Sequence, residues 1–170
     1  MSGRAGPVNR QVARVQSPLL DRLIDDAPDQ QRDAVASSAD SVTALRQSVR
    51  RDLEALLNAR RRWRSLPAHM TQLATSPVGY GIPDFASGAF SDTRRREELR
   101  EEIEATIRRF EPRFLSVRVN LIDNQDRLDT TLRLRIEAVM HAEPAPEPVT
   151  FDTLVDPTRD DVVVRQGGMV

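Results

Sequence analysis

The sequence contains no cysteine, and all 25 of its basic residues are arginine, so lysine is absent as well. The lack of cysteine excludes disulfides, thiolate zinc sites, iron–sulfur clusters and thiol nucleophiles. The lack of lysine excludes Schiff-base chemistry and a P-loop. The two histidines, His69 and His141, lie far apart in the sequence, which excludes a multi-histidine metal site within one chain. We therefore expect neither a metal nor a cofactor.

Long apolar runs are also missing, since no stretch approaches the roughly 20 residues that a membrane-spanning helix needs. The first residues carry Arg, Pro and Gly without an apolar stretch, so no secretory signal is expected. These features predict a soluble protein of the compartment in which it is made, without direct insertion into a membrane. Its 170 residues provide about one domain.

The charges cancel globally but are segregated along the chain. The 25 basic and 26 acidic residues give a net charge of -1, so global charge predicts no nucleic-acid partner. Locally, residues 17–40 carry a net charge of -4, residues 41–64 carry +5, and residues 140–170 return to -4. Such segments either dock against partners or each other, or form solvated faces, and the sequence leaves both interpretations open.

Helical spacing of apolar residues dominates the first two thirds of the chain. Residues 1–16 are predicted to be a disordered arm, after which Ser17 and Pro18 begin a short helix that ends at Pro28. Apolar residues at steps of three and four predict long helices over 41–64 and 92–110. Prolines and glycines in residues 65–90 predict a connection without a regular element.

After residue 113 the apolar period changes to two, which is typical of strands. Strands are predicted over 114–122, 127–140 and 149–155, and a turn over 123–126 joins the first two. In the first strand, one face is expected to carry Leu115, Val117, Val119 and Leu121. An even-numbered hairpin loop would oppose Leu115 to Leu134 and Val117 to Leu132.

The predicted fold class is α+β, with N-terminal helices packed on one face of a small antiparallel sheet of about three to four strands. The domain is expected to span residues 17–155. Residues 156–170 are predicted to be a polar tail, in which only 162–164 could pair with a strand.

The Glu111-Pro112-Arg113 segment lies where the second long helix meets the first strand. Pro112 cannot continue the helix and favours extended geometry at Glu111, so the side chains of Glu111 and Arg113 would leave the same face. The pair could contact a partner, pin the junction structurally, or perform acid–base catalysis. A glycosidase would need a second carboxylate, and the spacing does not select among Asp123, Asp129 and Glu137. A neighbouring guanidinium also lowers a carboxyl pKa, which is unsuited to a general acid.

Two further segments carry distinctive residues. The 78–85 segment contains the single tyrosine between two glycines, which allow a tight backbone turn while the ring packs on the core. We interpret this segment as a structural loop made of Tyr80, Gly81, Pro83, Asp84 and Phe85. The arginine-rich 60–64 segment, which includes Trp63, could hold a nucleic acid, but arginines at the end of a helix also favour its dipole.

Four segments in this order carry a resemblance: SPLLDRL at 17–23, the helical residues 45–58, YGIPDF at 80–85 and Phe-Glu-Pro-Arg at 110–113. Together they resemble the TssE family of type VI secretion baseplate proteins, within the contractile-phage wedge family once labelled lysozyme-like. The likeness covers about residues 17–155, and the N-terminal arm and the C-terminal tail lie outside it.

The resemblance implies a structural part of an assembly and not an enzyme. Family members join the baseplate wedge to the first ring of the contractile sheath, in a cytoplasmic baseplate docked near the inner membrane. The implied partners are the wedge proteins TssF and TssG, with TssK in the same complex, and the sheath proteins TssB and TssC. The family's Glu-Pro-Arg maps onto Glu111, Pro112 and Arg113, which would dock to the wedge. The resemblance also implies that an edge of the sheet accepts strands from a partner, since the family's terminal sheet resembles the strand-exchange domain of the sheath subunit.

One expectation for a charge-reversal variant follows from this resemblance, and one alternative function of a different class stays open beside it. An Arg113→Glu reversal is expected to leave the isolated fold intact while abolishing wedge binding. The alternative function is a peptidoglycan-cleaving muramidase that uses Glu111.

Overall fold

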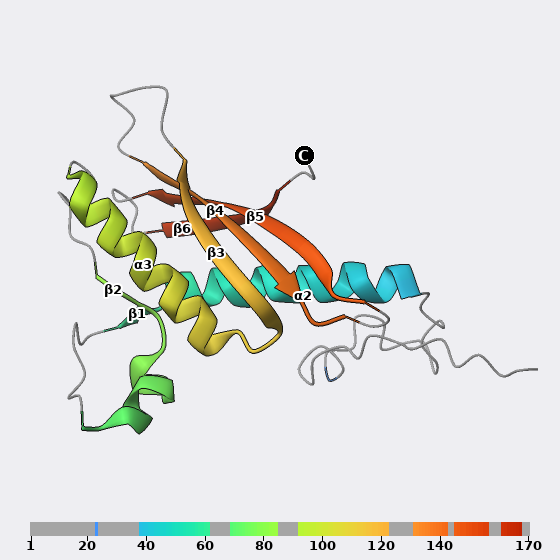
Figure 1. The fold of residues 1–170 in the computed structure, drawn as a ribbon, viewed down its shortest axis with the longest axis horizontal. Helices are drawn as coiled ribbons and strands as arrows, with labels where there is room; N and C mark the ends of the chain where they lie inside the picture. The colour runs from blue at the N-terminus through green and yellow to red at the C-terminus, as the bar shows by residue number, and fades with distance from the viewer. Residues whose placement is uncertain are drawn as a thin grey trace, which may run out of the picture.

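The computed structural model describes Leu23 and residues 38–61, 69–84, 92–122, 131–142, 145–156 and 161–167. The predicted arm at 1–16 lies outside the described residues. So do all of the short helix predicted after Ser17 except Leu23, which is helical, and the turn predicted at 123–126. Figure 1 shows the described elements as two long helices and a curved antiparallel sheet.

The first long helix, α2, spans Ser38–Asn58. Its apolar residues recur at steps of three and four and form one buried stripe, as the sequence predicted. The stripe consists of Leu45, Val49, Leu53, Leu56 and Leu57. Full burial of such a side chain contributes about 1.5–3 kcal/mol, so the stripe fixes how α2 packs on the sheet.

Helix α2 ends at Asn58, and the sequence-based prediction that it continues to residue 64 is wrong. Arg60–Arg61 instead form a short strand, β1, which pairs in parallel with β2 at Ile82–Pro83. The Arg60 Nη1 donates to the Leu57 carbonyl oxygen over 2.8 Å, and so satisfies one of the free carbonyls at the helix end. The pairing with β2 joins residues 20 or more positions apart, which helical periodicity cannot report.

The connection that follows contains short regular elements where the sequence predicted none. Two 3₁₀ helices, η1 at Thr71–Thr75 and η2 at Pro77–Gly79, precede β2. Ser76 caps η2, because its side chain accepts from the Val78 N–H over 3.2 Å while Pro77 occupies the first turn. These elements lead the chain into the buried residue Ile82.

The second long helix, α3, spans Thr93–Phe110 and confirms the prediction for this segment within one residue. The Asp92 side chain caps it by accepting from the Arg94 N–H over 2.9 Å. Its buried face consists of Leu99, Ile103, Thr106 and Ile107. Arg108 and Arg109 lie in its last turn, where positive charge favours the helix dipole.

Four strands form the main sheet in the order β3-β4-β5-β6. Their bounds are Phe114–Ile122, Leu132–Met140, Glu147–Asp156 and Asp161–Gln166, and every neighbouring pair is antiparallel. The strand β6 lies within the segment predicted as a polar tail, and it includes the 162–164 stretch that was expected to be able to pair. The predicted α+β class with three to four strands is confirmed.

The register of the first hairpin has the predicted parity but different partners. Val117 pairs with Ala138, where the sequence predicted Leu132, and Leu121 pairs with Leu134. Because β4 begins at Leu132, the connection after β3 is longer than a four-residue turn. Side chains alternate between the inner and the outer face of the sheet with period two. Apolar patterning therefore determines that inward residues of β3 pair with inward residues of β4, but a register shifted by an even number of residues satisfies it equally well.

A bulge at the start of β3 overturns the prediction that Leu115 belongs to the buried face. Phe114 pairs with Met140 and Ser116 with Val139, so Leu115 is inserted between them without a counterpart. The Leu115 side chain is 49% exposed. Val117 and Val119 beyond the bulge are buried as predicted.

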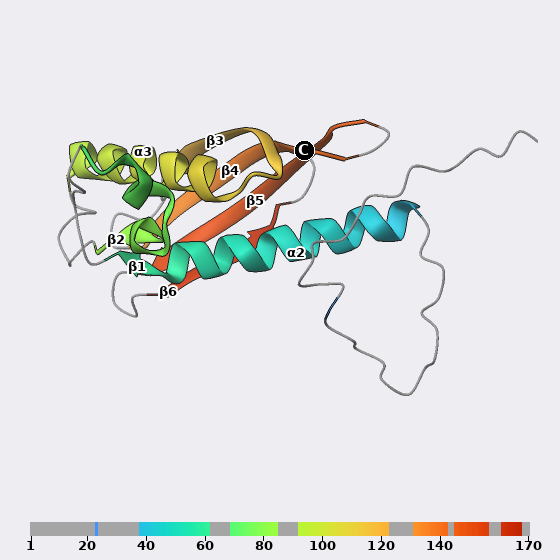
Figure 2. The same ribbon diagram turned by 90° about the horizontal axis from the view of Figure 1, so that it is seen from below.

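Both long helices cover the same face of the sheet (Figure 2). Helix α3 packs along β3 and α2 packs on β6, so the helices lie over opposite edges of the sheet. The core between the two layers contains Leu53 from α2, Ile103 from α3, and Ile136 and Phe151 from the central strands. The junction between α3 and β3 therefore lies at one end of this core, and α2 lies near it.

Candidate partner-binding site at the helix–strand junction

The Glu111-Pro112-Arg113 segment forms a tight connection between α3 and β3. The Glu111 N–H donates to the Ile107 carbonyl over 2.9 Å and completes the helix. Its φ of -114° and ψ of 83° lie outside the helical region, as expected for a residue before proline. The Arg113 carbonyl accepts from the His141 N–H over 2.8 Å, which ties the connection to the end of β4.

Glu111 and Arg113 form a close ion pair with two side-chain hydrogen bonds. The Arg113 Nε donates to Glu111 Oε1 over 2.5 Å, and Nη2 donates to Oε2. The Arg113 backbone N–H also donates to Oε1 over 3.2 Å. Glu111 is 4% exposed. The carboxylate is therefore almost removed from water and depends on this guanidinium for its counter-charge.

Two residues of α2 complete the cluster. Arg113 Nη2 donates to Asp52 Oδ2 over 2.7 Å, and Nη1 donates to Ser48 Oγ over 3.2 Å. Ser48 and Asp52 are four residues apart, so they lie on one face of α2 beside its apolar stripe. Sequence reasoning missed both residues. Their helical spacing was the only signal, and many polar residues share it.

We call Ser48, Asp52, Glu111 and Arg113 the junction cluster. Burial would lower the pKa of Arg113, but hydrogen bonds and charge attraction from Glu111 and Asp52 raise it above its usual value. The guanidinium therefore stays charged at any physiological pH and holds α2 against the α3–β3 junction.

The junction cluster gives limited support to the alternative of a carboxylate pair for hydrolysis. It does bring a second carboxylate, Asp52, near Glu111, although sequence analysis had considered Asp123, Asp129 and Glu137 instead. Of these three, only Glu137 lies within the described residues, as an exposed residue of β4. The Arg113 guanidinium bonds to both Glu111 and Asp52. The guanidinium therefore lies between the two carboxylates, where a glycosidase would have to place its substrate or the attacking water.

Tyr80 lies beside the junction cluster. Its ring meets that of Phe110 edge to face, with centroids 5.3 Å apart and an interplanar angle of 75°. The ring therefore packs on Phe110 at the margin of the core, as predicted, but Tyr80 as a whole remains 38% exposed and is only partly covered. Ile82 is the buried side chain of this loop, and the loop's Phe85 lies outside the described residues.

The single tyrosine provides a spectroscopic test of this arrangement. Burial, and then the charges of Asp52 and Glu111, raise the pKa of Tyr80 above 10.0. We expect tyrosinate absorbance to appear at higher pH in the folded protein than in denaturant. In the folded Asp52→Asn variant this difference in pH should be smaller, because one of the two negative charges is removed. Because the folded state favours the neutral phenol, the free energy of unfolding should fall as pH rises above about 10. A folded-state midpoint at or below 10 would contradict the geometry.

The first two arginines of the arginine-rich 60–64 segment make contacts within the fold. The Arg61 side chain is 6% exposed and pairs with Glu102 of α3 over 2.6 Å, which ties β1 to that helix. Together with the Arg60 contact at the end of α2, this gives both arginines a structural role. Arg62, Trp63 and Arg64 lie outside the described residues.

The described residues also show which other kinds of site they lack. They contain no group of three or more His, Cys, Asp or Glu side chains that could hold a metal ion. Among them, no helix combines the length and apolar character that crossing a membrane requires.

Comparison with known families identifies the class of this protein. The family described as baseplate wedge protein gp25 matches residues 43–145, more than half of the chain, and this range includes most of α2 and all of α3, the junction cluster and β3–β4. The chain belongs to this family, which includes TssE, and the resemblance noted in the sequence is thereby confirmed. A comparison with curated proteins gives no match. The protein is thus a baseplate wedge component of a contractile, phage-tail-like system, in a family whose role is structural.

Proposed function

We propose that this chain is the type VI secretion baseplate protein that joins the wedge complex to the first ring of the contractile sheath, without catalysing a reaction. Its partners would be TssF and TssG in the wedge, with TssK in the same complex, and TssB and TssC in the sheath. It would act in the cytoplasm, in a baseplate docked near the inner membrane. Family membership supports the wedge part of this proposal.

The observation that carries the proposal is the position of Arg113 within the junction cluster. The guanidinium donates to two carboxylates and a hydroxyl from two separate segments, which suits rigid positioning better than turnover. Glu111, Pro112 and Arg113 would then act in partner binding by holding a surface of fixed shape.

That surface combines charged and apolar groups. Around the junction cluster, Pro112 is exposed, Leu115 is 49% exposed and Tyr80 is 38% exposed. Aromatic and aliphatic side chains beside a preorganised charged group are typical of the centre of a protein interface. We propose that the wedge partner covers Leu115, which the bulge in β3 turns out of the core.

An interface variant tests this assignment. We expect Leu115→Asp to weaken co-purification with TssF and TssG by about tenfold or more, the loss that a hot-spot residue worth about 1.4 kcal/mol produces. The matched control is Leu154→Asp, since Leu154 is 37% exposed and lies on β5, away from the junction. Both variants should keep the native circular dichroism spectrum. Equal co-purification of the two folded variants would exclude Leu115 from the interface.

A further inference from the structure

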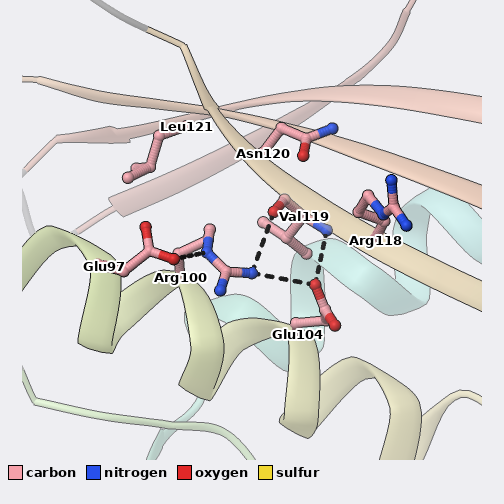
Figure 3. A pocket seen from close by; sticks show the side chains of 7 residues that line it. All are labelled: Glu97, Arg100, Glu104, Arg118, Val119, Asn120 and Leu121. Atoms are coloured by element: carbon pink, nitrogen blue, oxygen red, sulfur yellow. Dashed lines mark hydrogen bonds and ion pairs between the residues drawn. The ribbon is translucent and has the colours of Figure 1, made fainter.

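The outer edge of β3 is occupied by side chains of α3 (Figure 3). Glu104 Oε2 accepts from the Val119 N–H over 3.0 Å. Arg100 Nη1 donates to the Val119 carbonyl oxygen, and Arg108 Nη2 donates to that of Val117, each over 3.3 Å. These backbone groups point away from β4, toward the position where another strand would pair. Three side chains of one helix therefore take hydrogen bonds that a partner strand would need.

The three α3 side chains also hold one another. Glu104 bonds to Arg100 over 3.1 Å and to Arg108 over 2.7 Å, and Arg100 bonds to Glu97 over 2.6 Å. Burial would raise the pKa of Glu104, but the Val119 N–H and the two arginines hold it below its usual value. Glu104 thus remains an ionised acceptor at neutral pH, and charge-assisted hydrogen bonds of this kind are stronger than neutral ones.

The opposite edge of the sheet, along β6, is occupied in the same way by α2. Asn58 Oδ1 accepts from the Val162 N–H over 2.9 Å, and Asn58 Nδ2 donates to the Val162 carbonyl oxygen over 2.8 Å. Arg50 Nη1 donates to the Val164 carbonyl over 3.3 Å. The amide of Asn58 thus presents a donor and an acceptor to Val162, as the backbone of a neighbouring strand would.

The two edges therefore share one pattern. At each, one valine has both its N–H and its carbonyl bonded to helix side chains, and the carbonyl of a second valine two residues away is bonded as well. We call Arg100, Glu104 and Arg108 the β3 guard, and Asn58 and Arg50 the β6 guard. Packing of apolar helix faces on the sheet does not by itself require polar side chains to reach these backbone groups.

We propose that the two guards close the edges of this sheet and keep two copies of the chain from pairing edge to edge. An unpaired edge strand presents a row of backbone donors and acceptors to any other strand, and the nine residues of β3 are long enough to be such a hazard. The occupant excluded is a second copy, because an identical edge always offers a matching antiparallel partner. This inference concerns pairing between copies and does not depend on the proposed function; a sheath strand that pairs at an edge, as the resemblance implies, would have to displace one guard.

The guards can be removed without touching the core. The β3 guard is removed by the triple variant Arg100→Ala, Glu104→Ala and Arg108→Ala. Its control is Arg94→Ala with Glu98→Ala, an ion pair of 3.0 Å on the same helix that is exposed and away from the edge. Asn58→Ala opens the β6 edge, and Gln47→Ala, an exposed amide elsewhere on α2, is its control.

Sedimentation velocity over a series of concentrations measures self-association of the full chain. We expect each guard variant to associate about tenfold or more tightly than its control, the factor that two net backbone hydrogen bonds supply. Hydrogen exchange of the freed amides, Val119 or Val162, should be fast in dilute samples and slow again as copies pair. Since the chain has no cysteine, Arg118→Cys should crosslink copies in the β3 guard variant and not in the native background.

Hydrogen exchange shows whether a folded variant has lost the hydrogen bonds of its guard, and so distinguishes that case from a variant that does not fold. A guard variant that exposes the Val119 or Val162 amide, yet associates no more than its control at any concentration, would overturn the proposal. Circular dichroism identifies a variant that does not fold. Because the guards lie on different helices and opposite edges, the remaining guard then decides the question.

Discussion

Arg113→Ala should destabilise the protein by about 3–5 kcal/mol, because breaking a buried ion pair leaves an uncompensated charge in the core. Glu111, at 4% exposure, would lose the guanidinium that it contacts through both carboxylate oxygens, and Asp52 would lose its link to the junction. Chemical denaturation at neutral pH, followed by circular dichroism, measures the loss as a change in the free energy of unfolding.

The control for this prediction is Arg135→Ala. Arg135 also pairs with an aspartate of another element, since its Nε donates to Asp152 over 2.9 Å, but both side chains are well exposed. Water screens such a pair, so a much smaller loss is expected. Restoring much of the stability by adding Glu111→Leu to Arg113→Ala would show that the unpaired carboxylate is the cause. Equal losses for Arg113→Ala and Arg135→Ala would show that the junction cluster contributes little.

The same contacts change the expectation for charge reversal at this position. From the sequence, Arg113→Glu was expected to leave the isolated fold intact. The structure places Arg113 between Glu111 and Asp52, so the reversal would bring a third carboxylate to two others. We now expect Arg113→Glu to lower stability at least as much as Arg113→Ala. Loss of wedge binding by this variant would therefore not identify a contact, which is why Leu115 is the better probe.

Gly81→Ala should be the second most damaging of the substitutions considered, with a loss of about 2–5 kcal/mol from backbone strain and overpacking. Gly81 has a φ of 94°, in the region that glycine alone adopts freely. A Cβ there would lie 2.3 Å from the Ala59 carbonyl oxygen, which accepts the hydrogen bond from the Ile82 N–H. The added methyl would thus separate β1 from β2 and displace buried Ile82.

Gly167→Ala provides the matched control for the glycine prediction. Its added Cβ would lie 3.0 Å from the Thr150 methyl group, 3.2 Å from the Thr150 carbonyl oxygen and 3.3 Å from Asp152 Oδ2, contacts that shifts of a few tenths of an ångström relieve and that are far looser than the 2.3 Å at Gly81. A loss below about 1 kcal/mol is expected, as for most substitutions near the surface. Denaturation curves of the two variants, recorded under the same conditions, test the difference. Similar stabilities would mean that the backbone around Gly81 relaxes easily and that the β1–β2 contact is dispensable.

The sequence predicted the features that depend on residues close together along the chain. Apolar steps of three and four located α3 within one residue, and the change to a period of two located β3, β4 and β5 and the parity of the first hairpin. The Glu111–Arg113 pair could also be predicted, because Pro112 places two side chains only two residues apart on one face. Such features depend on local backbone geometry, which the local sequence largely specifies.

Predictions were wrong or incomplete where a contact joins distant segments. The helix predicted to reach residue 64 ends at Asn58 because β1 pairs with β2, and Leu115 leaves the core because the register shifts against β4. In each case a local pattern allows two outcomes, and pairing with a remote strand selects one. Parity could be read from apolar alternation, but the exact partner could not.

What the sequence by itself determined is the α+β class, the family and the position of the charged junction, since each rests on short-range patterns of residue type. Only the tertiary structure decided that Ser48 and Asp52 complete the junction cluster, and that Asn58 and Glu104 occupy the two sheet edges. Those contacts join residues 15 to 104 positions apart. They depend on how the two helices lie across the sheet, and the packing of the whole core sets that arrangement.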